Sequence, residues 1–131
     1  MIDDILSMPE IFEIDGKEYK AEFDCRSYAI LESMTGKSVY RIQDLIADNN
    51  LFLMDSIEVV CASLIKNHTE AEIKEVREKL TLSPCLLVQI NMPVITSFFK
   101  GIAPPEIFKR VLELQGKIKD IDKKKEKKIK V

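Results

Sequence analysis

Residues 11–24, IFEIDGKEYKAEFD, constrain the fold of this chain more than any other stretch. An Asp15-Gly16 pair stands between two runs of alternating apolar and polar residues, which is the strongest short-range signal for a β-hairpin with a two-residue turn. Closing that turn pairs Phe12 with Tyr19. One face of the hairpin then carries Phe12, Ile14, Tyr19, Ala21 and Phe23. Because a lone hairpin is marginally stable in water, this face requires a cover of other elements.

Helical patterns follow the hairpin through nearly all of the remaining chain. Apolar spacing and capping signals predict five helices, over about residues 25–34, 39–47, 51–66, 70–80 and 84–100. The expected fold class is α+β, mainly α-helical, with the N-terminal β-hairpin followed by five to six helices in a single domain, which suits a length of 131 residues. The expected division is 1–103 for the hairpin and helical core, and 104–131 for a C-terminal amphipathic helix and lysine-rich tail.

Apolar stripes indicate which helix faces belong to the core. The first helix should end at Gly36 and present Tyr28, Leu31 and Met34. The third has the most regular period, and its predicted core face is Leu53, Met54, Ile57, Val60, Cys61, Leu64 and Ile65. The fourth should turn Ile73, Val76 and Leu80 inward. The fifth starts at Ser83-Pro84, contains Pro93 and is apolar on every side, so we expect it to be central or to meet a partner.

Beyond a helix-breaking segment at residues 101–105, apolar residues recur at the spacing of a coiled-coil seam. They are Ile107, Val111, Leu114, Ile118 and Ile121. The seam covers only about two heptads, so it allows self-association without fixing a number of subunits. With the end of the fifth helix it supplies the candidate partner-binding residues, Phe98, Phe99, Ile107, Val111, Leu114 and Ile118. The same spacing equally suits docking of the final helix on the chain's own core.

Charge is divided unevenly along the chain. Of the net charge of −2, residues 117–131 contribute +5, from eight Lys against three acidic residues, which leaves −7 for residues 1–116. An acidic body with a basic tail is unlike a domain whose main surface binds nucleic acid. The N-terminus lacks the basic and apolar blocks of a signal peptide, and the most apolar stretch, 85–99, is shorter than a membrane span. Neither export nor a membrane partner is therefore expected.

The motifs that suggest specific chemistry are incomplete. Gly36-Lys37-Ser38 matches the end of a nucleotide-binding P-loop, but Leu31 stands where the first glycine is required. We interpret Gly36 as a helix terminus, Lys37 as an exposed turn residue and Ser38 as the cap of the next helix. His68, the single histidine, lacks partners at metal-ligand or catalytic spacing and fits a turn between helices. The three cysteines form no zinc or disulfide pattern. Taken together, these motifs predict no catalytic residue, metal or cofactor, and an enzyme is not expected.

The order of the elements is more specific than any single motif. The hairpin FEIDGKEYKAEFD precedes a helix ending in SMTGKSV, a short helix, a long helix with DSIEVVCASLIKN and a capped helix TEAEIKEVREKL. Over about residues 11–100 this order resembles the tail assembly chaperones of long-tailed bacteriophages and the related small proteins of prophages and gene transfer agents. The resemblance rests mainly on the hairpin followed by Thr35-Gly36, and on the helix capped by Thr69 and Glu72.

The resemblance implies a non-enzymatic protein in the cytoplasm of the bacterial host, absent from the mature virion. Such a chaperone keeps the tape-measure protein soluble and helps tail-tube subunits assemble around it. The expected partners are therefore the tape-measure and tail-tube proteins of the same phage. Two other functions stay open: a structural tail-completion or head-tail joining protein, and a small regulator that binds nucleic acid through the lysine-rich tail.

Overall fold

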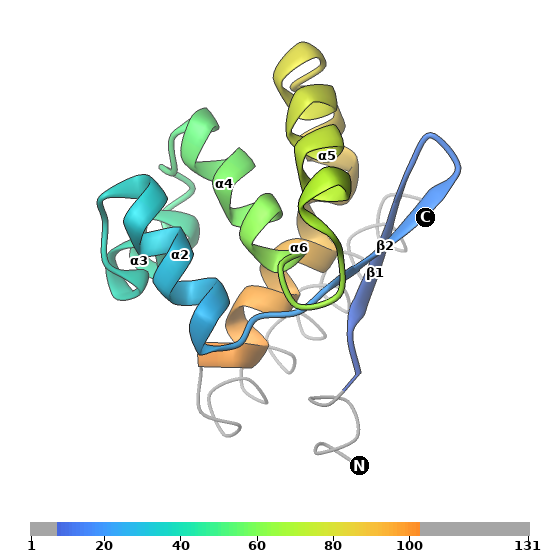
Figure 1. Ribbon diagram of the computed structural model, residues 1–131. Coiled ribbons are helices and arrows are strands. Elements are labelled where there is room, and N and C mark those ends of the chain that lie inside the picture. The colour runs from blue at the N-terminus through green and yellow to red at the C-terminus, as the bar shows by residue number, and fades with distance from the viewer. Residues whose placement is uncertain (1–7, 103–131) are drawn as a thin grey trace, which may run out of the picture.

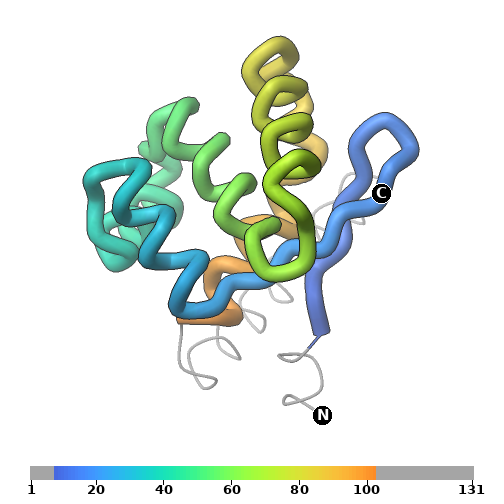
Figure 2. Tube along the Cα trace, viewed as in Figure 1, coloured from blue at the N-terminus to red at the C-terminus, as the bar shows by residue number. Residues whose placement is uncertain are grey.

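A computed structural model describes residues 8–102 of the chain (Figures 1 and 2). The described elements are, in chain order, β1 (Glu10–Ile14), β2 (Lys17–Ala21), α2 (Cys25–Thr35), α3 (Val39–Ala47), α4 (Leu53–Ser63), α5 (Glu70–Leu82) and α6 (Leu86–Ile102). They confirm the expected fold class, because a two-stranded antiparallel hairpin precedes a predominantly helical remainder in one domain. Residues 104–131, for which the sequence predicts a final helix and tail, lie outside the described residues.

The hairpin forms with the predicted register. β1 and β2 are antiparallel, and Phe12 lies opposite Tyr19. Asp15 and Gly16 form the turn with φ angles of 52° and 81°. A two-residue turn of the type that matches strand twist requires positive φ at both central positions, which explains the Asp-Gly pair. The buried face of the two strands consists, as expected, of Phe12, Ile14, Tyr19 and Ala21.

Helices α6 and α4 cover this buried face. Both strands contact α6, beside which Figure 1 shows the hairpin, and β2 also contacts α4. The amide of Glu22, just after β2, donates a hydrogen bond of 2.9 Å to the carbonyl oxygen of Ser63 at the end of α4. Because α6 contacts α4 as well as both strands, it takes the central place that the sequence indicates for the fifth helix.

Helix α2 begins and ends where the sequence predicts. Asp24 accepts a hydrogen bond of 2.9 Å from the amide of Ser27, and Gly36 follows the last turn with a φ of 69°. Leu31 is buried, but Met34 is 52% exposed, so its prediction as a core residue is wrong. Helix α2 contacts α3 and α4. Its buried face carries Ser27 and Leu31, and Met34 lies at the edge of that face.

Helix α4 contacts α2, α5 and α6, so it lies at the centre of the helical part. Its buried residues begin at Ile57 and continue to Ser63, with Leu64 buried just beyond the helix. Leu53 and Met54, predicted at the start of the same core stripe, are instead 51% and 59% exposed. The helical period correctly identifies the inward side of α4, but Leu53 and Met54 in its first turn stay exposed.

The fifth predicted helix, α6, differs from expectation at both ends and on one face. It begins at Leu86, two residues later than predicted, and extends to Ile102, so it includes the first two residues of the segment that the sequence marks as a break. It also continues through Pro93. Val88 and Met92 are 82% and 59% exposed, so α6 is not enclosed on every side. Its buried face is Leu87, Ile90, Val94, Ser97 and Phe98.

A close approach between α2 and α6 explains why a glycine lies inside α6. The hydroxyl group of Tyr28 donates a hydrogen bond of 2.6 Å to the carbonyl oxygen of Phe98. A Cβ atom at position 101 would lie 2.2 Å from this hydroxyl oxygen. Gly101 therefore leaves the space that the Tyr28 side chain needs to reach the backbone of α6.

Candidate partner-binding groove

Two helices stand on either side of α4 and leave a groove between them. Both α2 and α5 contact α4, and Figure 1 shows them apart from each other beside it. The side chains of the three helices enclose a groove with a volume of about 330 Å³. We call this the α2–α5 groove; its apolar lining includes Ile30, Met34, Cys61, Ala62, Ile65 and Ile73.

The wall formed by α2 carries apolar side chains that remain open to solvent. Ile30 and Met34 lie one helical turn apart and are 39% and 52% exposed. On the floor, Cys61 and Ala62 are buried, and Ile73 on α5 is half-buried. An apolar groove between helices is the type of surface on which an amphipathic helix docks. The flexible thioether of Met34 suits such a surface because it adapts to different partner side chains.

Charged residues also line the groove. The Nη2 atom of Arg77 lies 2.9 Å from Oε2 of Glu58, whose side chain is only 13% exposed. The Nη2 atom of Arg26 donates a hydrogen bond of 3.4 Å to the carbonyl oxygen of Ile65. Arginine and methionine are both enriched in protein interfaces, where the guanidinium group supplies hydrogen bonds beside apolar contacts. The composition of the groove therefore matches that of a protein-binding surface.

Cys61 is the one cysteine in the floor of the groove. Burial raises the pKa of its thiol, so the side chain is protonated at neutral pH. A protonated thiol is a weak nucleophile. Cys61 therefore contributes apolar surface to the groove.

His68 also lines the groove and is held by contacts with β2 and α5. Its Nε2 atom accepts the backbone N–H of Lys20 at 2.9 Å, and its ring lies 5.3 Å from the ring of Tyr19. Because Nε2 is an acceptor, Nδ1 carries the proton and donates to Oε2 of Glu72 at 3.2 Å. This bond and the amide of Thr69 lower the pKa of Glu72 to about 2. The predicted turn residue thus joins the hairpin to α5 through both ring nitrogens.

The Gly36-Lys37-Ser38 segment is occupied by structural contacts. Gly36 terminates α2, and the Ser38 side chain accepts a hydrogen bond of 3.1 Å from the Arg41 amide, so both roles are as predicted. Lys37 differs from its prediction as an exposed residue, because its Nζ atom lies 2.7 Å from Oδ2 of Asp55 on α4. A preceding helix and an engaged lysine are incompatible with a P-loop, which requires a strand and a lysine free to reach phosphates.

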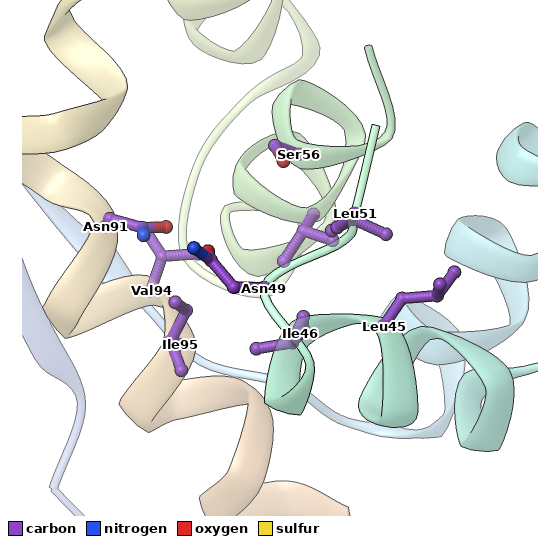
Figure 3. A pocket seen from close by; sticks show the side chains of 9 residues that line it. Leu45, Ile46, Asn49, Leu51, Ser56, Asn91, Val94 and Ile95 are labelled. Atoms are coloured by element: carbon purple, nitrogen blue, oxygen red, sulfur yellow. The ribbon is translucent and has the colours of Figure 1, made fainter. Parts of the chain in front are cut away.

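A smaller cavity lies where the end of α3 and the start of α4 approach α6 (Figure 3). Asn49 and Asn91 both line it, together with apolar residues that include Val94 and Ile95 (Figure 3). The cavity has a volume of about 70 Å³. Small-molecule sites have volumes of roughly 300–1,000 Å³, so this cavity is too small for a nucleotide or similar cofactor.

The residues that the sequence suggests for partner binding divide into two sets. Phe98 is fully buried, where it makes edge-to-face contacts with Phe23, Tyr28 and Phe99. Phe99 is half-buried and packs against the core. The contacts of Phe98 with Tyr28 pack α6 against α2. The other four residues, Ile107, Val111, Leu114 and Ile118, lie outside the described residues.

Sequence reasoning did not single out Ile30, which lines the groove beside Met34. Ile30 and Met34 form an i, i+4 apolar pair next to Leu31, which is a signal of a second strip on α2. The apolar pattern alone does not show whether Ile30 and Met34 are buried together with Leu31 or form an exposed strip beside it. Ile73 on α5 was predicted to face inward, and only the position of α2 across α4 makes it part of a groove.

Two classes of site are not found among the described residues. Within residues 8–102, no group of three or more His, Cys, Asp and Glu side chains is arranged to hold a metal ion. In the same part of the chain, no helix combines the length and the apolar character needed to cross a membrane. Comparison with known proteins adds no assignment, since no family model, curated protein or solved structure matches the chain.

Proposed function

We propose that this protein is a non-catalytic tail assembly chaperone of a bacteriophage or prophage, acting in the cytoplasm of the bacterial host. The elements on which the sequence resemblance rests are present in the fold: the Asp-Gly hairpin, the helix that ends at Gly36 and the capped helix α5. The observation that carries the proposal is the α2–α5 groove, an apolar surface open to solvent on a small helical domain.

The proposed client is a helical segment of the tape-measure protein. A client helix with apolar residues at positions i, i+3, i+4 and i+7 presents one apolar face, which can lie along Ile30 and Met34. Both residues are about half exposed, so complete burial of each adds about 1 kcal/mol of binding free energy. Contributions of this size are moderate, which suits a chaperone that must release its client to the tail-tube subunits.

Co-expression with the tape-measure protein encoded by the same phage is the direct test. We expect the two proteins to co-purify and the tape-measure protein to become more soluble. Met34→Asp should weaken the complex by about 2 kcal/mol, roughly 30-fold, because it places a charge in the apolar groove. Met54→Asp is the matched control, because Met54 has a similar exposure of 59% but lies outside the groove.

Two results would count against this assignment. Failure of the wild-type protein to co-purify with the tape-measure protein, or to raise its solubility, contradicts the proposed function. Equal losses for Met34→Asp and Met54→Asp place client binding outside the groove. Mass spectrometry of purified virions gives a separate check, since an assembly chaperone is absent from finished particles and a tail-completion or joining protein is present in them.

A further inference from the structure

The chain contains a segment of its own that fits the α2–α5 groove. Residues 106–121 follow α6 and carry apolar residues at helical spacing. We propose that this C-terminal segment docks in the α2–α5 groove as an amphipathic helix and so competes with the client of the same groove. The competition rests on the proposed function, whereas the docking itself concerns this chain alone.

The segment and the groove wall have matching lengths. Helix α2 contains 11 residues, so it is about 16 Å long at 1.5 Å per residue. A helix from Ile107 to Ile118 has nearly the same length. Its four apolar residues, Ile107, Val111, Leu114 and Ile118, are separated by steps of 4, 3 and 4 and share one helix face. That face can therefore contact the apolar lining along the whole of α2.

The position where α6 ends places the segment near the groove. The last turn of α6 lies against the first turn of α2, because the hydroxyl group of Tyr28 reaches the carbonyl oxygen of Phe98 at 2.6 Å. Arg26, in that same first turn of α2, lines the groove. The four residues 103–106 can span up to about 14 Å when extended, which suffices to pass one helix. Two of them, Pro104 and Pro105, disfavour a straight continuation of α6.

Net charge also favours docking of the segment on its own chain. Residues 103–131 contain ten basic and five acidic residues, a net charge of +5, whereas residues 1–102 carry −7. Opposite charges attract the two parts at close range. A short linker also raises the effective concentration of the segment at the groove to the millimolar range, above that of a second copy in dilute solution. The C-terminal segment of the same molecule is therefore favoured over that of a second copy as the occupant of the groove.

Thiol alkylation of the full-length chain tests the docking. Met34→Cys is introduced together with Cys25→Ser and Cys85→Ser, which remove the two exposed native thiols and leave the buried Cys61. The rate at position 34 is then compared with and without Val111→Asp/Leu114→Asp, which disrupts the apolar face of the segment. We expect alkylation to be about tenfold slower with the native segment, the value for a segment docked nine-tenths of the time. In a second pair of proteins, Met54→Cys outside the groove should react at equal rates.

Each outcome of this experiment decides the proposal. Equal rates at position 34 with the native and the disrupted segment overturn the docking. Protection that is lost on dilution from about 100 µM to about 1 µM overturns the intramolecular assignment, because a tethered segment is insensitive to concentration. Protection at every concentration supports docking within one molecule.

The competition with the client is measured separately. Val111→Asp/Leu114→Asp should bind the tape-measure protein more tightly than the wild-type chain does, by the same factor of about ten. Equal client binding by both proteins overturns the competition and leaves the docking intact. Protection at position 34 without client binding by either protein means that the proposed function fails while the docking stands.

Discussion

Replacement of Gly101 by alanine tests the contact that fixes α6 against α2. In an unobstructed helix this substitution stabilises the protein by about 1 kcal/mol, because glycine is a poor helix former. At position 101, however, the new Cβ atom would lie 2.2 Å from the hydroxyl oxygen of Tyr28 and 3.1 Å from the carbonyl oxygen of Phe23. We therefore predict a destabilisation in place of the usual gain.

The expected loss is about 2 kcal/mol in the free energy of unfolding. Overpacking of a well-packed contact costs about 2 kcal/mol. Displacement of the Tyr28 ring also breaks its hydrogen bond to the carbonyl oxygen of Phe98, which adds about 1 kcal/mol. The gain of about 1 kcal/mol in helix propensity offsets part of this loss. A net loss of about 2 kcal/mol corresponds to a fall in Tm of about 10 °C for a domain of this size.

Denaturant unfolding of a double-mutant cycle separates the contact from other effects. Tyr28→Phe removes the atom closest to the new Cβ, so Gly101→Ala should cost less than about 1 kcal/mol in the Tyr28→Phe background. Ser33→Ala, at an exposed position of α2, is the control for helix propensity and should change stability by less than about 0.5 kcal/mol. A Gly101→Ala protein as stable as the wild type, or an equal cost in both backgrounds, would contradict the close approach.

Three further predictions concern the hairpin and α5. Tyr19→Phe should leave stability unchanged or raise it by up to about 1 kcal/mol in thermal unfolding, because the buried Tyr19 hydroxyl has no hydrogen-bond partner among the described residues; a clear loss would reveal a partner. Thr69→Ala removes the capping box with Glu72 and should lower the free energy of unfolding by about 1 kcal/mol. Thr81→Ala, later in α5, should have a smaller effect, and equal effects of the two substitutions would exclude the cap as the cause. The pKa of Glu72 is about 2 in the folded protein and about 4.3 when unfolded, so its carboxylate stabilises the fold fully above about pH 5 and progressively less as the pH falls toward 2. Glu72→Gln should therefore flatten this part of the stability curve in denaturant unfolding at pH 2 to 6, and an unchanged acid slope would refute the assignment.

Exposure alone does not identify a binding surface on this protein. Val88 and Met92 on α6 are at least as exposed as Ile30 and Met34 on α2. Scattered exposed apolar residues are ordinary on soluble proteins. The α2–α5 groove differs because its exposed side chains line a concave surface formed by three helices. Concavity increases the area that a partner helix can bury, which is why we assign client binding there.

The candidate groove could be predicted from the sequence only in part. The apolar pattern correctly places Cys61 and Ile73 on the inward faces of their helices. It predicts Met34 as a core residue, whereas Met34 is exposed. The reason is that a groove belongs to no single helix. Its existence depends on the spacing of α2 and α5 across α4, and no local signal in the sequence reports that spacing.

The sequence by itself determined the features that depend on a few adjacent residues. The Asp15-Gly16 turn needs positive φ at two positions, Asp24 and Thr69 cap the helices that follow them, and Gly36 supplies a left-handed helix end. Each of these signals acts through backbone conformation or hydrogen bonds within one helical turn. Such interactions form in the same way whatever the rest of the chain does, so they can be inferred from the local residues.

Only the tertiary structure decided which apolar and polar side chains are covered, and by what. The helical period indicates which side of α4 faces the core, but it does not show that Leu53 on that side remains exposed. Lys37 finds Asp55 and His68 finds the amide of Lys20 across long separations in the chain, and Gly101 is required by a tyrosine on another helix. These contacts arise from the relative placement of whole elements, which depends on the packing of the entire core. For that reason the helices, the hairpin and their order follow from local patterns, whereas the groove follows from the assembled fold.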